Sequence, residues 1–231
     1  MPLPKLSHIV YPIEFKSVGL KTTFRPFTVA EEKILMHIKD SNDPLFIRAN
    51  VKTLINNCVQ DPVDVEKLAT YDVENFMLRI RAKSVGETVD VQYTDPETKK
   101  VHKGKLDLEN IRVIEAANHN PKIEIADGVG VIMRDPDFAS AIAVQASKSS
   151  QADTAWKLVV QCIVSIYDAT TVYVVGKDTT LEEVSEFVDT IPNTVSSKLI
   201  EYIMSAPRLE ADITLDDGRV IPVTGLTNFL T

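Results

Sequence analysis

The spacing of apolar residues changes twice along this chain, and this change constrains the fold more than any other sequence feature. From Thr28 to Gly86, apolar residues recur at the 3.6-residue spacing of amphipathic helices. From Gly86 to about residue 133 they alternate with polar residues, which is typical of half-buried strands, and the helical spacing returns at Phe138. The sequence therefore predicts an α+β fold: a helical core with small antiparallel β-hairpins or sheets at the N-terminus, in the middle and at the C-terminus.

Strand signals are found in three places. Residues 8–27 predict a hairpin around Ser17-Val18-Gly19, and residues 211–226 predict another around Asp216-Asp217-Gly218, where an Asp-Gly pair favours a tight turn. The alternating segments between residues 87 and 133 predict one small antiparallel sheet in the middle of the chain.

Helix starts are marked by capping signals. Thr28 with Glu31, and Thr180 with Glu183, have the T-x-x-E spacing of a capping box, in which the hydroxyl and the carboxylate satisfy free backbone amides. Asp61 and Asp72 also have the character of N-caps. Residues 155–167 are apolar on nearly all sides, which predicts a buried core helix with Trp156 as a core residue.

The 231 residues have room for one large domain or two small ones. No Gly/Ser/Pro-rich linker separates the helical halves, and both terminal hairpins resemble edge structures that need a neighbour. We therefore expect a single intertwined α+β domain over 1–231, with 1–135 and 136–231 as its sub-halves.

Charge and composition favour protein partners. A formal net charge of −8 gives no electrostatic reason to bind nucleic acid or an anionic membrane. No window has the run of about 18 apolar residues that a membrane span needs, and the start lacks the apolar region of a signal peptide, so we expect a cytosolic protein. Cys58 and Cys162 fall in apolar helical segments and are expected to be reduced core residues.

Residues that carry chemistry are few and dispersed. The four histidines belong to different segments and have no second histidine or Cys-x-x-Cys at metal-binding spacing, and no nucleophile or phosphate-binding motif is present. We expect no enzyme, no cofactor and no metal. A metal-dependent hydrolase that uses Asp135, Asp137 and His119 is the alternative from another class, although an acidic residue beside a proline before a helix is also what an N-cap looks like.

Several longer strings carry a family resemblance. They are FRPFTVAEEKILM from Phe24, INNCV, DVEKLATYDVENFMLRIRAKSVGE from Asp64, KIEIADGVGVIMRDPDF, CIVSIYD and the closing GLTNFL. Together they resemble the baseplate hub assembly proteins of T-even-type contractile-tailed bacteriophages. The resemblance runs nearly end to end and is weakest over residues 139–155 and 174–195.

This resemblance implies a non-enzymatic, chaperone-like assembly factor that helps to build the central hub of the tail baseplate by protein–protein binding. The alternative is a structural subunit that is retained in the hub of the virion. The implied partners are other baseplate hub proteins and the tape-measure protein. The implied location is the host cytoplasm during tail assembly, or the tail baseplate of the virion under the alternative.

The resemblance also bears on metal. Relatives often carry Cys-x-x-Cys in the hairpin before the final GL-x-x-F, and some carry cysteine in the middle hairpin. Here these places contain Leu215-Asp216-Asp217-Gly218 and Thr94-Asp95-Pro96-Glu97. We therefore expect plain turns without a metal site.

Two groups of charged and aromatic residues are the candidate partner-binding site: Arg25, Phe27, Glu31, Glu32 and Lys33, and the basic helix residues Arg79, Arg81 and Lys83. For the first group the alternative is that Arg25 pairs with Glu31 or Glu32 and locks the hairpin to the helix. For the second group the alternative is an ordinary solvated helix face.

Overall fold

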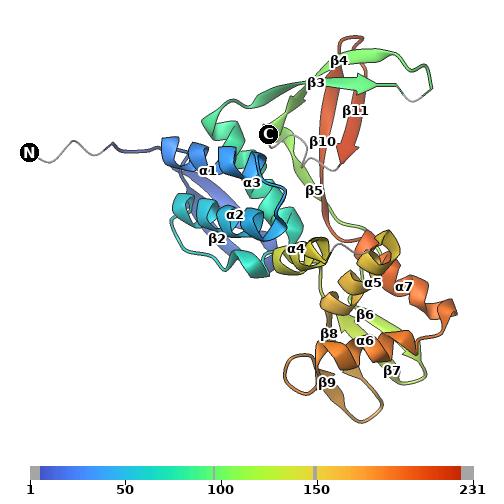
Figure 1. Ribbon diagram of the computed structural model, residues 1–231. Coiled ribbons are helices and arrows are strands. Elements are labelled where there is room, and N and C mark those ends of the chain that lie inside the picture. The colour runs from blue at the N-terminus through green and yellow to red at the C-terminus, as the bar shows by residue number, and fades with distance from the viewer. Residues whose placement is uncertain (1–5, 96, 148–149, 225–231) are drawn as a thin grey trace, which may run out of the picture. The chain divides into compact units, whose positions relative to one another are not determined.

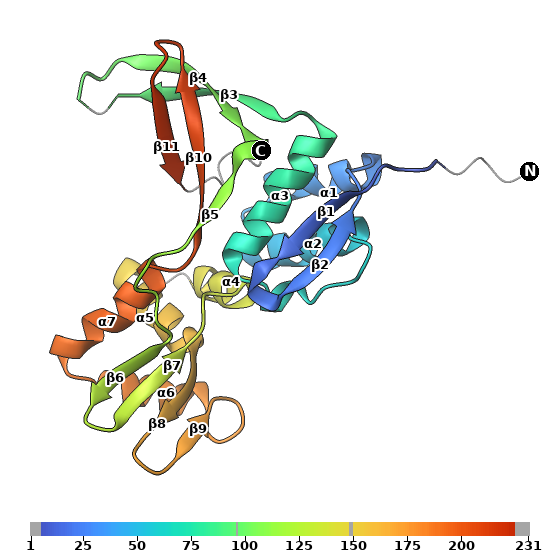
Figure 2. The same ribbon diagram turned by 180° about the vertical axis from the view of Figure 1, so that it is seen from behind.

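The computed structural model describes residues 6–95, 97–147 and 150–224 (Figures 1 and 2). Two compact units make up the chain: unit 1 is formed by residues 1–42, 46–114 and 208–231, and unit 2 by residues 43–45 and 115–207. The expectation of one domain with sub-halves 1–135 and 136–231 stays a prediction. Two places named from the sequence lie outside the described residues: the closing string GLTNFL at residues 225–230, which carries part of the resemblance, and Pro96 in the predicted turn of the middle hairpin.

Unit 1 begins with the expected hairpin of β1 (Tyr11–Phe15) and β2 (Leu20–Phe24), joined by a 3-10 turn over Lys16–Val18. Gly19 closes the turn with a φ of 64°, which favours glycine. Phe15 and Phe24 are fully buried and both lie against the ring of Phe76, at centroid distances of 5.8 and 5.5 Å. Three aromatic rings therefore hold the hairpin on the helices.

Three helices pack with this hairpin: α1 (Val29–Lys39), α2 (Pro44–Cys58) and α3 (Thr70–Ser84). The capping box predicted at Thr28 and Glu31 is present at the start of α1. The cap predicted at Asp72 is wrong, because α3 begins two residues earlier. Asp72 is buried and accepts hydrogen bonds from the backbone amides of Lys16 and Ser17 at 3.1 and 2.8 Å, so its carboxylate secures the hairpin turn instead.

Asp61, also predicted as a cap, accepts a hydrogen bond from the hydroxyl of Thr22 in β2 at 2.8 Å. The short 3-10 turn that follows, over Val65–Lys67, has Asp64 as its N-cap. The carboxylates of both predicted caps, Asp61 and Asp72, therefore accept hydrogen bonds from the hairpin and do not cap the helices predicted to follow them in sequence.

The second part of unit 1 is an antiparallel sheet that joins the middle of the chain to its C-terminal hairpin. Its strands are β3 (Thr88–Thr94), β4 (Val101–Asp107), β10 (Arg208–Leu215) and β11 (Val220–Thr224) in the order β11-β10-β4-β3, and β5 (Arg112–Ile114) also pairs with β10. Gly104 permits the close approach of β4 and β10, since a Cβ there would meet Ile213 at 2.6 Å. Leu78 and Ala82 of α3 pack into the core of this sheet.

Unit 2 is a two-layer α/β arrangement. Its sheet has the order β6 (Lys122–Ala126), β7 (Val129–Met133), β8 (Ile163–Tyr167) and β9 (Val172–Val174). Its helices are α4 (Phe138–Ala146), α5 (Gln151–Cys162), α6 (Leu181–Asp189) and α7 (Asn193–Met204). Figure 2 shows the sheet in front of α5, α6 and α7, which share its buried core.

Two expectations about these strands are wrong. The alternating segments between residues 87 and 133 do not form one middle sheet, because β3, β4 and β5 pair within unit 1 and β6 and β7 pair within unit 2. The predicted core helix over 155–167 ends at Cys162, and Ile163–Tyr167 forms β8, one of the two inner strands of the sheet. A continuous apolar run does not distinguish a buried helix from a buried strand. Trp156, predicted as a core residue, is 37% exposed on α5.

The sheet of unit 2 has one covered and one exposed face. Val131 and Met133 point into the core beneath the helices, whereas Ile132 on the opposite face is exposed. Ser165 pairs with both Ile132 and Val174, and Val172 lies two residues from Val174, so these side chains share the outer face. The outer face of unit 2 is therefore mixed: Ile132, Val172 and Val174 are exposed on it, beside the charged residues Lys122 and Glu124 of β6, which pair with Ile132 and Gly130.

Candidate partner-binding site

Arg25 lies between β2 and α1 and pairs with Glu31 rather than with Glu32. Its two terminal nitrogens each contact one carboxylate oxygen of Glu31 at 3.0 Å, and they also donate to the backbone oxygens of Pro26 and Asn57, both at 3.0 Å. Asn57 is near the end of α2, where the last carbonyls need donors. Arg25 therefore locks the hairpin to α1 and α2, as one of the two alternatives predicted.

The electrostatics of this pair favour the charged state of both groups. The Glu31 side chain is only 3% exposed. Burial alone would raise the pKa of Glu31, but hydrogen bonds from Arg25 and from the hydroxyl and amide of Thr28 outweigh this effect and lower the pKa to about 2. The hydrogen bond from Glu31 in turn raises the pKa of Arg25. The ion pair is a structural element of unit 1.

The other residues of the first candidate group differ in exposure. Phe27 is half-buried, and its backbone amide donates to the hydroxyl of Ser84 at the end of α3, at 2.9 Å. Glu32 and Lys33 are exposed on α1. Only these two present their charges fully to solvent, and their role in partner binding stays a prediction.

The basic residues of α3 do not form a single patch. Each residue turns a helix by about 100°, so Arg79 and Lys83 share one side while Arg81 lies on another. Lys83 contacts carboxylate oxygens of Glu109 and Glu87 at 2.6 and 2.8 Å, which raises the pKa of its amino group. Arg79 donates one long hydrogen bond, 3.4 Å, to the backbone oxygen of Ile111. Of this group, the charge of Lys83 is already neutralised within unit 1.

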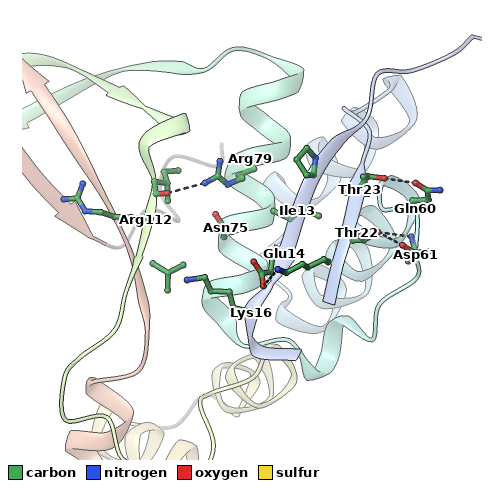
Figure 3. A pocket seen from close by; sticks show the side chains of 14 residues that line it. Ile13, Glu14, Lys16, Thr22, Thr23, Gln60, Asp61, Asn75, Arg79 and Arg112 are labelled. Atoms are coloured by element: carbon green, nitrogen blue, oxygen red, sulfur yellow. Dashed lines mark hydrogen bonds and ion pairs between the residues drawn. The ribbon is translucent and has the colours of Figure 1, made fainter. Parts of the chain in front are cut away.

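Arg79 also lines an open groove of about 860 Å³ in unit 1, which we call the β1–β5 groove. Figure 3 shows Arg79 and Asn75 pointing out from α3, with Lys16 at the end of β1 and Arg112 on β5. The groove extends over the exposed face of the hairpin to Thr23 and Gln60. Its walls come from β1, β2, α3 and β5, segments that are far apart in the sequence.

One polar network joins the two hairpin turns that the sequence predicted to be plain. His102 of β4 is buried, and its Nδ1 lies 3.2 Å from Asp216 and 3.3 Å from Asp217. A guanidinium nitrogen of Arg219 donates to Nε2 of His102 at 3.0 Å, so Nε2 accepts and Nδ1 carries the proton. Arg219 also contacts Asp95 in the other turn, at 3.3 Å.

This network contains the one group of three potential metal-ligating side chains that lie together in the described part of the chain. Arg219 pairs with the carboxylate of Asp217. Because Arg219 also donates to Nε2 of His102, the ring proton stays on Nδ1, the nitrogen that faces the carboxylates and that a metal would need free. The hydrogen bond from His102 lowers the pKa of Asp216. These residues satisfy one another as an ion-pair network between the hairpins.

The residues considered for a hydrolase are only partly brought together. His119 contacts Asp135 at 2.6 Å through Nε2 and the hydroxyl of Ser205 at 3.0 Å through Nδ1, and its ring stacks on Tyr202. Ser205 donates its own proton to the backbone oxygen of Tyr202, so it is not oriented as a nucleophile toward His119.

Asp137, the third residue considered for a hydrolase, caps α4 through the amide of Ser140 at 2.7 Å and pairs with Arg134. Its carboxylate is therefore turned to the start of α4. The contacts of His119 with Tyr202 and Ser205 fit a structural link between the loop at residue 119 and α7 better than a catalytic group.

Sequence reasoning missed Lys16, Asn75 and Arg112 as lining residues of the groove. Each is an ordinary polar residue of a turn, a helix or a strand, and no local pattern marks it. Lys16 lies beside the predicted hairpin turn, but only the pairing of β5 with β10 places Arg112 opposite that turn. The signal for this site is in the tertiary structure.

Comparisons with known proteins agree with the resemblance drawn from the sequence. A family model described as T4 bacteriophage base plate protein matches residues 8–230. Neither the curated proteins nor the solved structures gave a match. None of the helices in the described ranges has the length and hydropathy needed to cross a membrane. With nearly its whole length matched, the chain belongs to the T4 bacteriophage base plate protein family.

Proposed function

We propose that the protein is a non-enzymatic, chaperone-like assembly factor of the baseplate central hub. Membership of the family supports a structural or assembly role in the phage baseplate and interaction with other baseplate components. The observation that carries the finer proposal is the group of exposed apolar residues on the outer face of the unit 2 sheet, Ile132, Val172 and Val174. Exposed apolar residues gathered on one face of a sheet are typical of surfaces that bind another protein.

The proposal assigns the activity to surfaces rather than to reactive groups. The charged groups of the two hairpin regions, Arg25 with Glu31 and His102 with Asp216 and Asp217, are engaged with one another. An assembly factor holds the adhesive surfaces of its partners until the symmetric structure closes, and complementary patches suffice for this task. The proposed partners are other hub proteins and the tape-measure protein.

The second candidate is a structural subunit that is retained in the virion. The same exposed apolar residues would then be covered permanently by a neighbouring subunit. Quantitative mass spectrometry of purified virions separates the two functions. An assembly factor is expected to be absent or far below the copy number of the hub proteins, and a stoichiometric amount would establish the retained subunit instead.

A second measurement tests the proposal that no metal-dependent chemistry is involved. Elemental analysis of the purified protein is expected to find no stoichiometric zinc, manganese or iron. A bound ion that is lost in an Asp135→Asn variant would support the hydrolase and contradict the proposed function. The matched control is Asp153→Asn, because Asp153 is exposed in the first turn of α5 and its carboxylate accepts a hydrogen bond from Ser150.

A further inference from the structure

The β1–β5 groove has an unusual charge for this protein. The chain carries a net charge of −8, yet four basic residues line the groove, Lys16, Lys21, Arg79 and Arg112, against only two acidic ones, Glu14 and Asp61. A surface that is locally basic on an acidic protein attracts acidic partners and repels other copies of the same chain.

Two of the four basic groups of the groove differ from the other two in their ion pairs. Arg112 contacts Glu210 and Asp212 at 2.6 and 2.8 Å, and Lys21 contacts Glu14 at 3.7 Å. Within the described residues, Lys16 and Arg79 form no ion pair. Figure 3 shows both of them pointing toward β5. The groove therefore presents two cations that a ligand can neutralise.

The backbone of β1 offers hydrogen-bonding groups at the edge of the same groove. The backbone oxygen of Thr23 accepts a hydrogen bond from the amide of Gln60, so the backbone N–H and C=O of Thr23 face away from β1. Pro12 is the register partner of Thr23, so the backbone groups of Pro12 face away from β2. Glu14, two residues along, has the same orientation and directs both its amide and its carbonyl to the open edge. Pro12 adds a carbonyl but has no amide to donate.

A second open edge lies across the groove. β5 pairs with β10 alone among the described strands, so its other edge is without a strand partner. In Figure 3, β1 lies between β5 and β2, which turns the open edge of β1 toward β5. Two open strand edges beside a groove are the arrangement in which an extended peptide adds as a further strand.

We propose that the β1–β5 groove binds an extended acidic segment of another baseplate protein. The backbone of the segment pairs with the open edge of β1 or β5, and its carboxylates, on alternate residues, contact Lys16 and Arg79. The inference rests on the proposed function, because it specifies the chemistry of the partner that an assembly factor would hold.

The direct test uses a fluorescein-labelled peptide of alternating Glu and Val as probe, because alternate residues of a strand point to the same side. Fluorescence anisotropy is expected to show binding to the full chain, and a peptide of alternating Lys and Val is expected not to bind. Lys16→Glu with Arg79→Glu should raise the Kd of the acidic probe by about tenfold or more.

A matched control has the same change of net charge outside the groove. Lys39 and Lys177 are both exposed and neither lines the groove, so Lys39→Glu with Lys177→Glu should leave the Kd nearly unchanged. Lys16→Met with Arg79→Met removes the two charges but keeps the apolar stems, which preserves the test if the reversed variant does not fold. An equal loss in groove and control variants, or no binding by the wild-type chain, would overturn the proposal.

Complementation in the phage separates a failure of this inference from a failure of the proposed function. A phage that lacks the gene should produce no tails, and the Lys16→Glu, Arg79→Glu variant should not restore them. Tails that form without the gene would contradict the proposed function. Full restoration of tails by the variant would contradict the proposed role of the groove and leave the proposed function standing. A changed oligomeric state of the variant in light scattering would also contradict the role of the groove, because the occupant would then be a second copy of the chain.

Discussion

The same four-residue motif begins a helix in each unit, but in two different environments. Thr28 and Glu31 form a capping box at the start of α1, and Thr180 and Glu183 form one at the start of α6. Glu31 is buried and pairs with Arg25, whereas Glu183 is exposed and accepts hydrogen bonds from Thr179 and Thr180. Both carboxylates have a lowered pKa, and in Glu183 the backbone amide of Thr180 is the main cause.

The difference shows that a local motif sets where a helix begins and the tertiary neighbours set how much that start contributes to stability. An exposed cap contributes its own hydrogen bonds, which are worth about 1 kcal/mol. A buried carboxylate that also accepts a bidentate arginine contributes more, because removal of the arginine leaves a buried charge that neither a cation nor water stabilises.

The largest expected effect is from Arg25→Ala. Removal of the guanidinium leaves the buried carboxylate of Glu31 without its cation and should lower the free energy of unfolding by about 3 kcal/mol, measured by urea denaturation. Lys33→Ala, an exposed change on the same helix, is the control and should have little effect. A midpoint unchanged by Arg25→Ala would show that this residue is a partner contact instead of a lock.

The pH dependence of stability should follow Glu31. The pKa of this group is about 2 in the folded chain against 4.5 for the unperturbed group. Its contribution is complete above pH 4.5 and is lost as the pH falls toward 2, so about 2 kcal/mol should be lost between pH 7 and pH 3. Glu31→Gln should lack this part of the pH dependence in denaturation curves. The same pH dependence in the wild-type chain and in Glu31→Gln would contradict a lowered pKa of Glu31.

A smaller effect is expected at the exposed capping box. Thr180→Ala removes the hydroxyl that accepts the amide of Glu183, and it should lower the stability of α6 by about 1 kcal/mol. Native-state hydrogen exchange of the α6 amides measures this effect on the helix itself. The control is Thr194→Ala at the exposed start of α7. A loss of stability in Thr180→Ala as large as that in Arg25→Ala would show that the two capping boxes do not differ.

The smallest effect is expected where a basic residue has no acidic partner. Arg79→Ala and Arg81→Ala should each lower the free energy of unfolding by less than about 1 kcal/mol, as substitutions outside buried networks usually do. Thermal denaturation of both variants beside Arg25→Ala would show whether pairing decides the cost. A large loss in Arg79→Ala alone would assign it a structural role through the carbonyl of Ile111.

The hairpins, both capping boxes and the fold class could be predicted because each depends on residues that are near one another in sequence. Ser17-Val18-Gly19 and Asp216-Asp217-Gly218 are turns by their own chemistry. Asp137 was also anticipated as an N-cap, and it does cap α4. In these places the local preference and the final structure agree.

The rest depends on partners that are distant in sequence. Asp72 has the composition of a cap, but the hairpin turn more than 50 residues away provides better donors for its carboxylate. The basic spacing of Arg79, Arg81 and Lys83 does not reveal that Glu87 and Glu109 neutralise only the last of them. The groove was invisible for the same reason, because its walls come from four separate segments.

Unit 2 interrupts unit 1 between β5 and β10, and this has a consequence for how the protein is made. A ribosome that has delivered the chain as far as residue 207 has supplied all of unit 2 but neither β10 nor β11. Until then the edge of β4 that faces β10 stays open, and an open edge favours pairing with other chains. Unit 2 can therefore be completed first during synthesis, and the last strands to emerge close the sheet of unit 1.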